Sequence, residues 1–461
     1  MYKPKNPLSR LIAGIMLMLA IAACSSCKDH DDESSIDYDK IADHTVLMYM
    51  VGDNNLSSLL ENNVRQAHRA MLDSVEVGTL NLVVMKDNKQ EGDKLPKLYW
   101  VHRNAEQKLD TVILQTWNED IDATDPDFFA SVLKTTFSRF NTPIKGIVLA
   151  SHAAGWVPVT TNHSYNSPRR NSFGYDQNNQ NKMAGSMELW DLAAAMRQGP
   201  KFDYVIMDCC HMGNAEVAYE LRDVTRYLVA SSLEVQGAGM PYRKVMTRLA
   251  RCQSVSDLRD ALDYSMQCYY NENAPYNGGK KGASVALYDL TFIPQLAESY
   301  QQLIRSNADR LSTLCNADGL TINDWLDYFQ FLGRESSTSS GSVHYKYYFF
   351  DIQDVINWLG EIDATAANSA LQALSHIVLK EYHSTQFWSE IIIYHHCGMA
   401  VSLPETIHLA DENGYQKFFY PFENQGNKLL AAYHLTAWGA MMGYSEKHCS
   451  SSEQCFKIKN G

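Results

Sequence analysis

Runs of apolar residues alternate along the chain with stretches of helical periodicity. Unbroken runs such as 45–51 and 144–150 are typical of strands buried on both faces of a parallel sheet. Between them apolar residues recur with the helical period, and Asp125-Pro126 supplies an N-cap and a first-turn proline to one such helix. This alternation predicts an α/β fold with a mostly parallel sheet flanked by helices. Further predicted strands are 80–85, an edge strand at 97–101, 204–207 and 227–231; the predicted helices are 56–71, 125–140, 187–197 and one beginning near Gly213.

Beyond residue 255 the same alternation continues less regularly. The pattern predicts helices at 255–270, 291–305, 351–359 and 365–380, strands at 283–288 and 399–403, and a loop at 271–282. We therefore divide the chain into four parts. They are a signal segment (1–23), an acidic linker (24–42), a main α/β domain (43–254) and a C-terminal α/β region (255–461) that packs on the main domain or continues it.

Composition and charge narrow the class of protein. The 461 residues are 45% hydrophobic and 20% charged, which suits a globular chain with a full core. The net charge is -13 and no block of Lys and Arg occurs, so we expect no nucleic acid partner. The 10 cysteines lack the regular spacing of a disulfide scaffold, and the consecutive Cys209-Cys210-His211 make a poor tetrahedral zinc set. The pattern His395-His396-Cys397 is better explained by structural histidines, so no metal site is predicted.

The first residues predict export and a lipid anchor. Lys3, Lys5 and Arg10 precede the apolar run 11–23, which is short for a membrane span and suits a secretory signal. The run ends in small residues before Cys24, which resembles the lipobox of bacterial lipoproteins and implies lipidation of that cysteine. The acidic stretch 28–33 also resembles an export signal to the outer face of the outer membrane. A plain secretory signal cut near Ala23 is the alternative, and the lipid is the only membrane contact that we expect.

Two predicted strands end in residues that carry chemistry. The strand 144–150 runs into Ser151-His152-Ala153, and the strand 204–207 into Asp208-Cys209-Cys210. Carboxyl ends of parallel strands share one edge of a sheet, where ligands bind, so an imidazole and a thiol can approach there. A nearby imidazole and a helix N-terminus both favour the nucleophilic thiolate. On spacing alone, a buried structural cysteine is the simpler interpretation.

The sequence around these residues resembles the clostripain-like cysteine peptidases, relatives of caspases, gingipains and legumains. The resemblance runs from about 43 to 440. It includes 46–51 followed by Gly52-Asp53-Asn54-Asn55-Leu56, the segment 114–122, His152 with Gly155-Trp156, the segment 202–223, and Ala230-Ser231. It implies a caspase-like catalytic domain at 43–254, with His152 as catalytic histidine and Cys210 as nucleophile. The amides of Ala153 and Cys210 would hold the oxyanion, and a polypeptide would be cut through an acyl-enzyme.

Cys209 takes the middle position of the family's Asp-x-Cys word. Strand alternation also places Asp208 and Cys210 on one face and Cys209 on the other, provided that the strand persists. We therefore prefer Cys210 as the nucleophile. The family's Asp-His-Gly is Ser151-His152-Ala153 here, and alanine cannot take the positive φ open to glycine.

The S1 preference is left open by the sequence. Relatives that cut after Arg or Lys place acidic groups in the S1 pocket, and Asp208 matches one of them. The second lies in a Gly-Asp-Gly-like word that is Gly237-Ala238-Gly239 here, and Glu234 is a candidate substitute. Trp156, beside the histidine, is expected to wall the site.

Three further expectations follow from the resemblance. The loop 157–186 carries Arg169, Arg170 and Lys182 and is either a plain exposed loop or a segment cleaved in processing. No cofactor is implied; some relatives need calcium, but the acidic residues show no calcium-loop spacing. The alternative function is a catalytically inactive peptide- or protein-binding lipoprotein on the same fold. The oligomeric state is not indicated.

Overall fold

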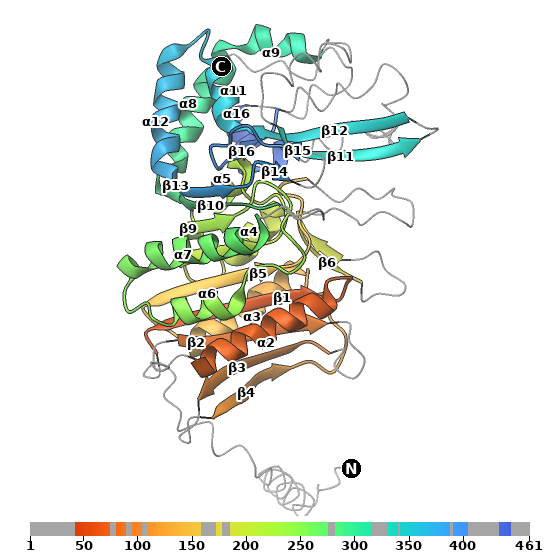
Figure 1. Cartoon of the computed structure of the whole chain (residues 1–461), viewed down its shortest axis with the longest axis vertical. Helices are drawn as coiled ribbons and strands as arrows, with labels where there is room; N and C mark the ends of the chain where they lie inside the picture. The colour runs from red at the N-terminus through yellow and green to blue at the C-terminus, as the bar shows by residue number, and fades with distance from the viewer. Residues whose placement is uncertain are drawn as a thin grey trace, which may run out of the picture.

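One large sheet forms the centre of the molecule. The computed structural model describes residues 42–73, 80–88, 95–103, 108–157, 172–177, 185–274, 282–315, 331–339, 342–387, 391–403 and 433–443. The strands of the large sheet are β1 (His44–Gly52), β2 (Leu80–Asn88), β3 (Lys97–Arg103), β4 (Leu109–Thr116), β5 (Ile144–Ala150), β8 (Phe202–Asp208), β9 (Thr225–Ala230), β10 (Ser284–Asp289) and β13 (Val378–His383). Their order is β13-β10-β9-β8-β5-β1-β2-β3-β4 (Figure 1). The five strands from β9 to β2 are parallel, and each outer strand is antiparallel to its inner neighbour. The predicted α/β fold with a mostly parallel sheet flanked by helices is confirmed.

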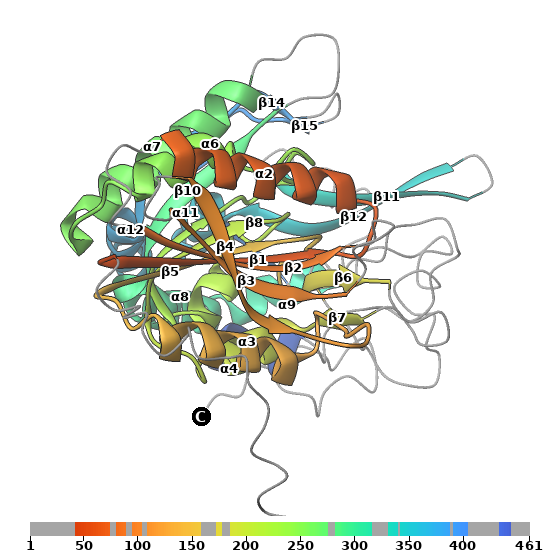
Figure 2. The same ribbon diagram turned by 90° about the horizontal axis from the view of Figure 1, so that it is seen from below.

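Helices cover both faces of this sheet. One face carries α2 (Ser57–Asp73), α6 (Tyr242–Leu249) and α7 (Val255–Asn273); the other carries α3 (Pro126–Arg139), α4 (Leu189–Met196), α5 (Ala215–Glu220), α8 (Ile293–Ser306), α11 (Ile352–Leu359), α12 (Ala364–Ile377) and α16 (Ala437–Met442). Figure 2 shows α2, α6 and α7 on one side of the strands and α3 and α4 on the other. Alternate residues of β1 enter the two cores: Tyr49 packs on one face and Met48 on the other. Burial on both faces explains the unbroken apolar run of this strand.

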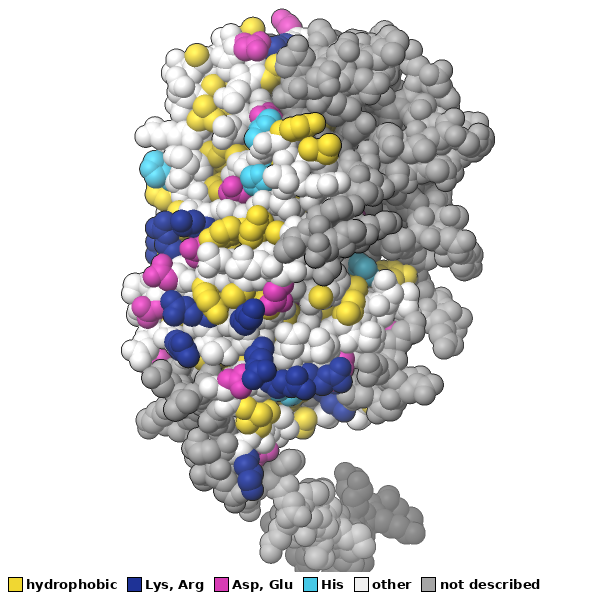
Figure 3. All heavy atoms as spheres, in the orientation of Figure 1, with side chains coloured by type: hydrophobic (Ala, Val, Ile, Leu, Met, Phe, Trp, Pro, Cys, Tyr) yellow, Lys and Arg dark blue, Asp and Glu magenta, His cyan; other side chains and the backbone are white. Residues whose placement is uncertain are grey.

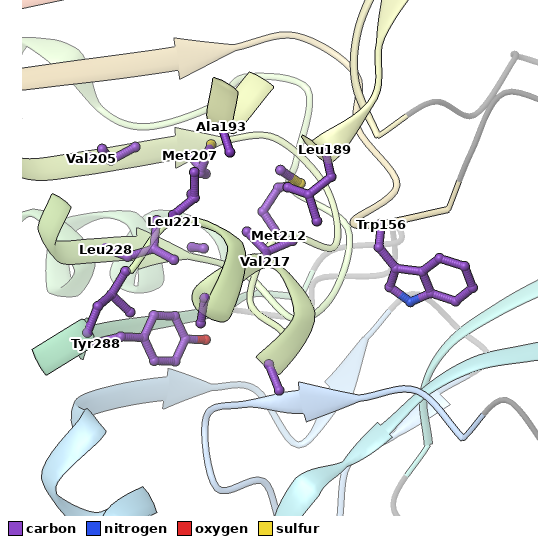
Figure 4. Packing of buried hydrophobic residues seen from close by; sticks show 14 of the residues in the cluster. Trp156, Leu189, Ala193, Val205, Met207, Met212, Val217, Leu221, Leu228 and Tyr288 are labelled. Atoms are coloured by element: carbon purple, nitrogen blue, oxygen red, sulfur yellow. The ribbon is translucent and has the colours of Figure 1, made fainter. Parts of the chain in front are cut away.

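The core beneath the carboxyl end of β8 is formed by side chains of β8, α4 and α5. Figure 4 shows the side chains of Val205, Met207, Met212, Val217, Leu221, Leu189 and Ala193 in this layer. Met212 follows the carboxyl end of β8 and is 0% exposed. Met207 before this segment and Met212 after it are both buried, so the core fixes both ends of the segment that carries Cys209 and Cys210.

Charges are mixed on the outer face of α2, α6 and α7. Figure 3 shows Lys and Arg interspersed with Asp and Glu there. Arg243 pairs with Asp73, and Lys244 lies 2.8 Å from Glu272. Such exposed pairs contribute little to stability. Within the described ranges, no helix has both the length and the apolar character needed to cross a membrane.

Three predicted elements differ from the structure, and the helix α6 is an addition to the prediction. The strand at 97–101 is not an edge, because β4 pairs outside it; β4 has exposed polar residues at 110, 111 and 116 and only a short apolar run at 112–114. The predicted helix 365–380 ends at Ile377, and the chain continues as β13 on the opposite edge of the sheet. The helix α6 was not predicted, although Tyr242, Val245, Met246 and Leu249 have helical spacing. The helix expected near Gly213 begins at Ala215.

The described part of the C-terminal region meets the segment that follows β8. Smaller sheets are formed by β11 (Phe331–Ser339), β12 (Ser342–Asp351) and β16 (Ala400–Val401), by β6 (Phe173–Asp176) with β7 (Gly185–Met187), and by β14 (Gln386–Phe387) with β15 (Ile391–Ile392). The β11–β12 hairpin projects from the body in Figure 1. Ala400 N–H of β16 donates to the carbonyl of Gly213 at 3.0 Å.

Candidate active site

A cavity of about 260 Å³ lies at the carboxyl ends of β5 and β8. His152, Asp208, Cys210 and Glu234 all line it, together with Ala153. β5 and β8 are adjacent parallel strands, with Ala150 paired to Asp208. The structure therefore brings the predicted histidine and cysteine into one cavity at the expected edge of the sheet.

The two neighbouring cysteines have different environments. Cys209 is 1% exposed, and burial raises the pKa of its thiol well above the ordinary value, with the nearby Cys210 and Asp208 adding to the shift. Cys210 is partly exposed, and its Sγ accepts a hydrogen bond from the N–H of Val235 at 3.3 Å. An N–H donor favours the thiolate over the thiol, and exposure gives a substrate access. This environment suits Cys210, and not Cys209, as a nucleophile.

The donor to this sulfur was not predicted. β8 ends at Asp208, so Cys210 lies in a turn rather than on the strand. The helix α5 begins only at Ala215, and its cap, Asn214, bonds to Val217 N–H and to the carbonyl of His211. The sulfur of Cys210 therefore accepts its hydrogen bond from the backbone N–H of Val235, and not from the N-terminus of a helix as expected.

The turn after Cys210 is held by tight packing. His211 has φ 58°, the one positive φ outside glycine among the described residues. Its ring stacks on Phe349 at 5.4 Å, and its Nδ1 lies 3.1 Å from the carbonyl of Ser232. Gly155 has φ 67°, and a Cβ there would lie 2.8 Å from the carbonyl of His211 and 2.7 Å from Asn214 Nδ2. The loops after β5 and β8 thus meet where only glycine fits.

The imidazole of His152 is held from several sides. The ring Nε2 lies 2.7 Å from Asn55 Oδ1, and the ring of Tyr175 lies edge-on with its centroid 6.3 Å away. The backbone carbonyl of His152 accepts a hydrogen bond from Gly174 N–H at 2.9 Å. Burial lowers the pKa of His152, while the charge of Glu234 raises it to a smaller extent. A lowered pKa keeps the imidazole neutral near pH 7, so it can accept a proton. Asn55 lies in a segment that carried the resemblance, but no sequence signal singled it out.

Alanine replaces the family's glycine without backbone strain at position 153. Ala153 is not among the residues with positive φ, and it forms an isolated bridge with Phe173. The expected conflict between alanine and a glycine conformation is therefore absent, and the main-chain N–H is retained.

Asp208 lies at the buried end of the cavity. It is 5% exposed, and its Oδ2 accepts hydrogen bonds from Tyr242 Oη at 2.6 Å and Met240 N–H at 3.0 Å. Burial raises the pKa of this carboxyl, and the two hydrogen bonds partly offset that shift. Its Oδ1 is buried with no hydrogen-bond donor in the described part of the chain. Gly239, with φ 65°, keeps the space beside this carboxylate open, because a Cβ would lie 2.4 Å from Oδ2.

Trp156 does not wall the site. It is 0% exposed, donates from Nε1 to Ser402 Oγ at 2.7 Å, and packs edge-on against Tyr433. It belongs to the buried cluster of Figure 4 and is absent from the cavity lining. The expectation that Trp156 walls the site is therefore corrected. Burial of the large apolar indole in the core is more favourable than its exposure in an open cleft. Arg169, Arg170, Lys182 and Cys24 lie outside the described residues.

A second cluster of ligand-type side chains is best explained as part of the fold. Ligand atoms of Asp351, His396 and Cys397 lie within 4.8 Å of one another. The Asp351 carboxylate already accepts hydrogen bonds from His396 Nδ1 at 2.9 Å, Cys397 N–H at 2.7 Å and Gln353 N–H at 2.9 Å. The bond from Gln353 caps α11, and the bonds from His396 and Cys397 lower the pKa of Asp351 in spite of its burial. A carboxylate satisfied in this way gains little from a metal ion.

Comparisons with known proteins identify a family and support the fold. The profile of the clostripain family matches residues 48–443. Clostripain from Hathewaya histolytica is 25% identical over 225 residues, which cover 44% of this chain and 42% of clostripain, so the match spans less than half of that relative's length. A secreted cysteine protease from Bacteroides thetaiotaomicron, solved with an irreversible peptide inhibitor, superposes with a TM-score of 0.63 at 19% identity over 88% of this chain and 100% of its own. An inactive zymogen protease from Parabacteroides distasonis gives 0.61 at 18% identity over 87% and 98%.

The family match defines the class of protein, because the clostripain family is a family of cysteine peptidases. The chain belongs to the clostripain family.

Proposed function

We propose that this protein is a cysteine endopeptidase whose dyad is His152 and Cys210. The observation that carries the proposal is their placement just after the carboxyl ends of the adjacent strands β5 and β8, around one cavity, with Cys210 partly exposed and hydrogen-bonded at sulfur. Membership of the clostripain family supports the same activity.

The proposed reaction begins with attack of Cys210 on the peptide carbonyl. His152 takes the thiol proton as the C–S bond forms, and the carbonyl oxygen becomes an oxyanion near the amides of Ala153 and Cys210. The C–N bond then breaks, and His152 gives its proton to the leaving amine. Water next attacks the thioester while His152 takes its proton, and the thiol is restored as the acid product leaves. Thiol and imidazole together supply these steps, so the mechanism requires no cofactor and assigns no role to calcium.

For specificity we propose a basic P1 side chain bound by Asp208. Its buried Oδ1 without a donor is an acceptor that a guanidinium or ammonium group would satisfy. Glu234 lines the same cavity and adds negative charge, although Ala238 stands where relatives carry a second acid.

A library of fluorogenic peptides that differ at P1 tests the activity. The purified chain should cleave Arg and Lys substrates fastest, and Cys210→Ala should lower kcat/KM by at least about 10³-fold. Cys209→Ala is the matched control, because it removes the neighbouring thiol from the core and should keep most of the activity. Equal rates in wild type and Cys210→Ala would refute the dyad. An inactive wild type whose Cys210 does not react with iodoacetamide would indicate a binding protein on the same fold.

We also propose that the protein is a lipoprotein anchored at the cell surface. The apolar run 11–23 before Cys24 and the acidic stretch 28–33 support this location. Cys24→Ser should move the protein from the membrane fraction to the soluble fraction and abolish incorporation of labelled palmitate. Protease added to intact cells should remove the wild-type protein. Retention of Cys24→Ser in the membrane would contradict lipid anchoring.

A further inference from the structure

We propose that Asn55 is the positioning residue of the catalytic histidine: its side-chain oxygen holds the Nε2–H tautomer of His152 and so assigns Nδ1 to proton exchange with Cys210. This inference rests on the proposed dyad and adds a residue that sets its protonation geometry.

The contact between the two side chains is short and directional. Asn55 Oδ1 lies 2.7 Å from His152 Nε2. A carbonyl oxygen only accepts hydrogen bonds, so Nε2 carries the proton in this arrangement. Neutral imidazole has one proton, and the other nitrogen, Nδ1, is then the base.

The segment that carries Asn55 is rigid even though Asn55 itself is exposed. The neighbouring Asn54 is 2% exposed, and its Nδ2 donates to the carbonyls of Val51 at 3.1 Å and Tyr175 at 2.6 Å. Its Oδ1 accepts from Leu56 N–H at 2.8 Å. Buried hydrogen bonds of this kind fix a turn. Asn54 therefore supplies the stability of the turn, and Asn55 is held in place by the backbone on either side of it.

The histidine side of the contact is braced by the same elements. Ser151 Oγ donates to the carbonyl of Val51 at 2.9 Å, so the residue before His152 is tied to the end of β1. Gly174 N–H and the Tyr175 ring hold His152 from β6. Because the ends of β1 and β5 are joined to each other and to β6 in this way, the amide and the imidazole keep their mutual orientation although Asn55 is exposed.

A neutral amide suits this role better than a carboxylate. A carboxylate at 2.7 Å would stabilise the imidazolium and raise the pKa of the ring, whereas an amide orients the ring and leaves the charge unchanged. Burial already lowers the pKa of His152. The ring is thus kept neutral and able to take the proton of the thiol.

Two substitutions at this position separate orientation from stability. Asn55→Ala should lower kcat by about 10- to 100-fold, change KM by less than about threefold and leave the melting temperature unchanged. Asn55→Asp restores the acceptor with a charge, so it should recover activity at higher pH and move the acid limb of the kcat/KM profile upward by about 1 pH unit or more. The matched control is Asn62→Ala, an exposed asparagine on α2, which should behave as wild type.

Two readouts do not depend on peptidase activity. Nitrogen NMR of the labelled protein, with His152 assigned by substitution, should show the Nε2–H tautomer in wild type and a mixture in Asn55→Ala. The pH dependence of Cys210 alkylation by iodoacetamide should shift in Asn55→Asp. If wild type cleaves no peptide, the proposed function fails and these two measurements still decide the role of Asn55. An Nδ1–H tautomer in wild type, or unchanged kcat and pH profile in both variants, would overturn the inference.

Discussion

At the scale of single residues, environment decides which of two adjacent thiols is chemically useful. Cys209 points into the core under β8, and Cys210 points into the cavity and meets the Val235 N–H. Strand alternation predicts the two directions, and they hold although the strand ends at Asp208. The donor from Val235 could not be predicted, because nothing in the local sequence of position 210 encodes a contact made by folding.

A buried carboxyl pair offers a test at the same scale. Asp87 is 1% exposed, and its carboxyl is hydrogen-bonded to the carboxyl of Asp176. Burial, followed by the charge of Asp176, the hydrogen bond to Asp176 and the charges of Asp53 and Asp120, raises the pKa of Asp87 to about 10. The unfolded carboxyl has a pKa of about 4, so between these values the folded chain binds a proton that the unfolded chain releases. The contribution of Asp87 to the free energy of unfolding therefore falls as the pH rises from the unfolded pKa toward the folded pKa.

Asp87→Asn removes this titration. We expect the free energy of unfolding to rise by about 1–3 kcal/mol at pH 8, with a smaller gain at pH 5. Urea unfolding at the two pH values measures the difference. The control is Asp223→Asn, whose side chain is 65% exposed and which should change little. A loss of stability at pH 8, or an equal gain at both pH values, would show that Asp87 is not the titrating group.

At the scale of elements, the site depends on how closely two loops approach. The loop after β5 meets the loop after β8 at Gly155, whose added Cβ would press on His211, Asn214 and Phe349.

Three elements were mispredicted, and they share one property. β4 and β13 are outer strands of the sheet, and α6 is short and polar on one side, so none of them has the long apolar signal of a central strand.

Gly155→Ala tests this approach. A positive φ costs about 1–2 kcal/mol in alanine, and the overlaps add about 1–3 kcal/mol, so thermal and urea unfolding should show a clear loss of stability. Peptidase activity should fall as well, because the displaced groups follow directly after Cys210. Gly199→Ala is the control: its nearest neighbour would lie 3.3 Å from the new Cβ, and its φ is ordinary. Wild-type stability in Gly155→Ala would contradict the tight loop contact.

At the scale of the whole molecule, residues on both sides of position 254 build one sheet. β10 and β13 extend the sheet beyond β9, so the division of the chain at 254 falls between neighbouring strands of one layer. Two acids of α5 also reach the C-terminal region. Glu216 Oε1 accepts a hydrogen bond from Ser402 N–H at 2.8 Å, and Glu220 Oε2 accepts one from Ala437 N–H at 2.7 Å. The short helix α5, which follows the turn at Cys210, is thereby fixed by residues that lie about 200 positions later in the chain.

The sequence by itself determined the α/β class, the central strands and the residues at their carboxyl ends. These features are local: apolar runs record burial on both faces, and a strand end is visible where such a run stops. Tertiary structure alone decided that Asn55 meets His152, that Val235 meets Cys210, and that Trp156 is in the core. Each of these contacts joins segments that are far apart in the chain, so they arise from the packing of elements and leave no periodic trace in the sequence.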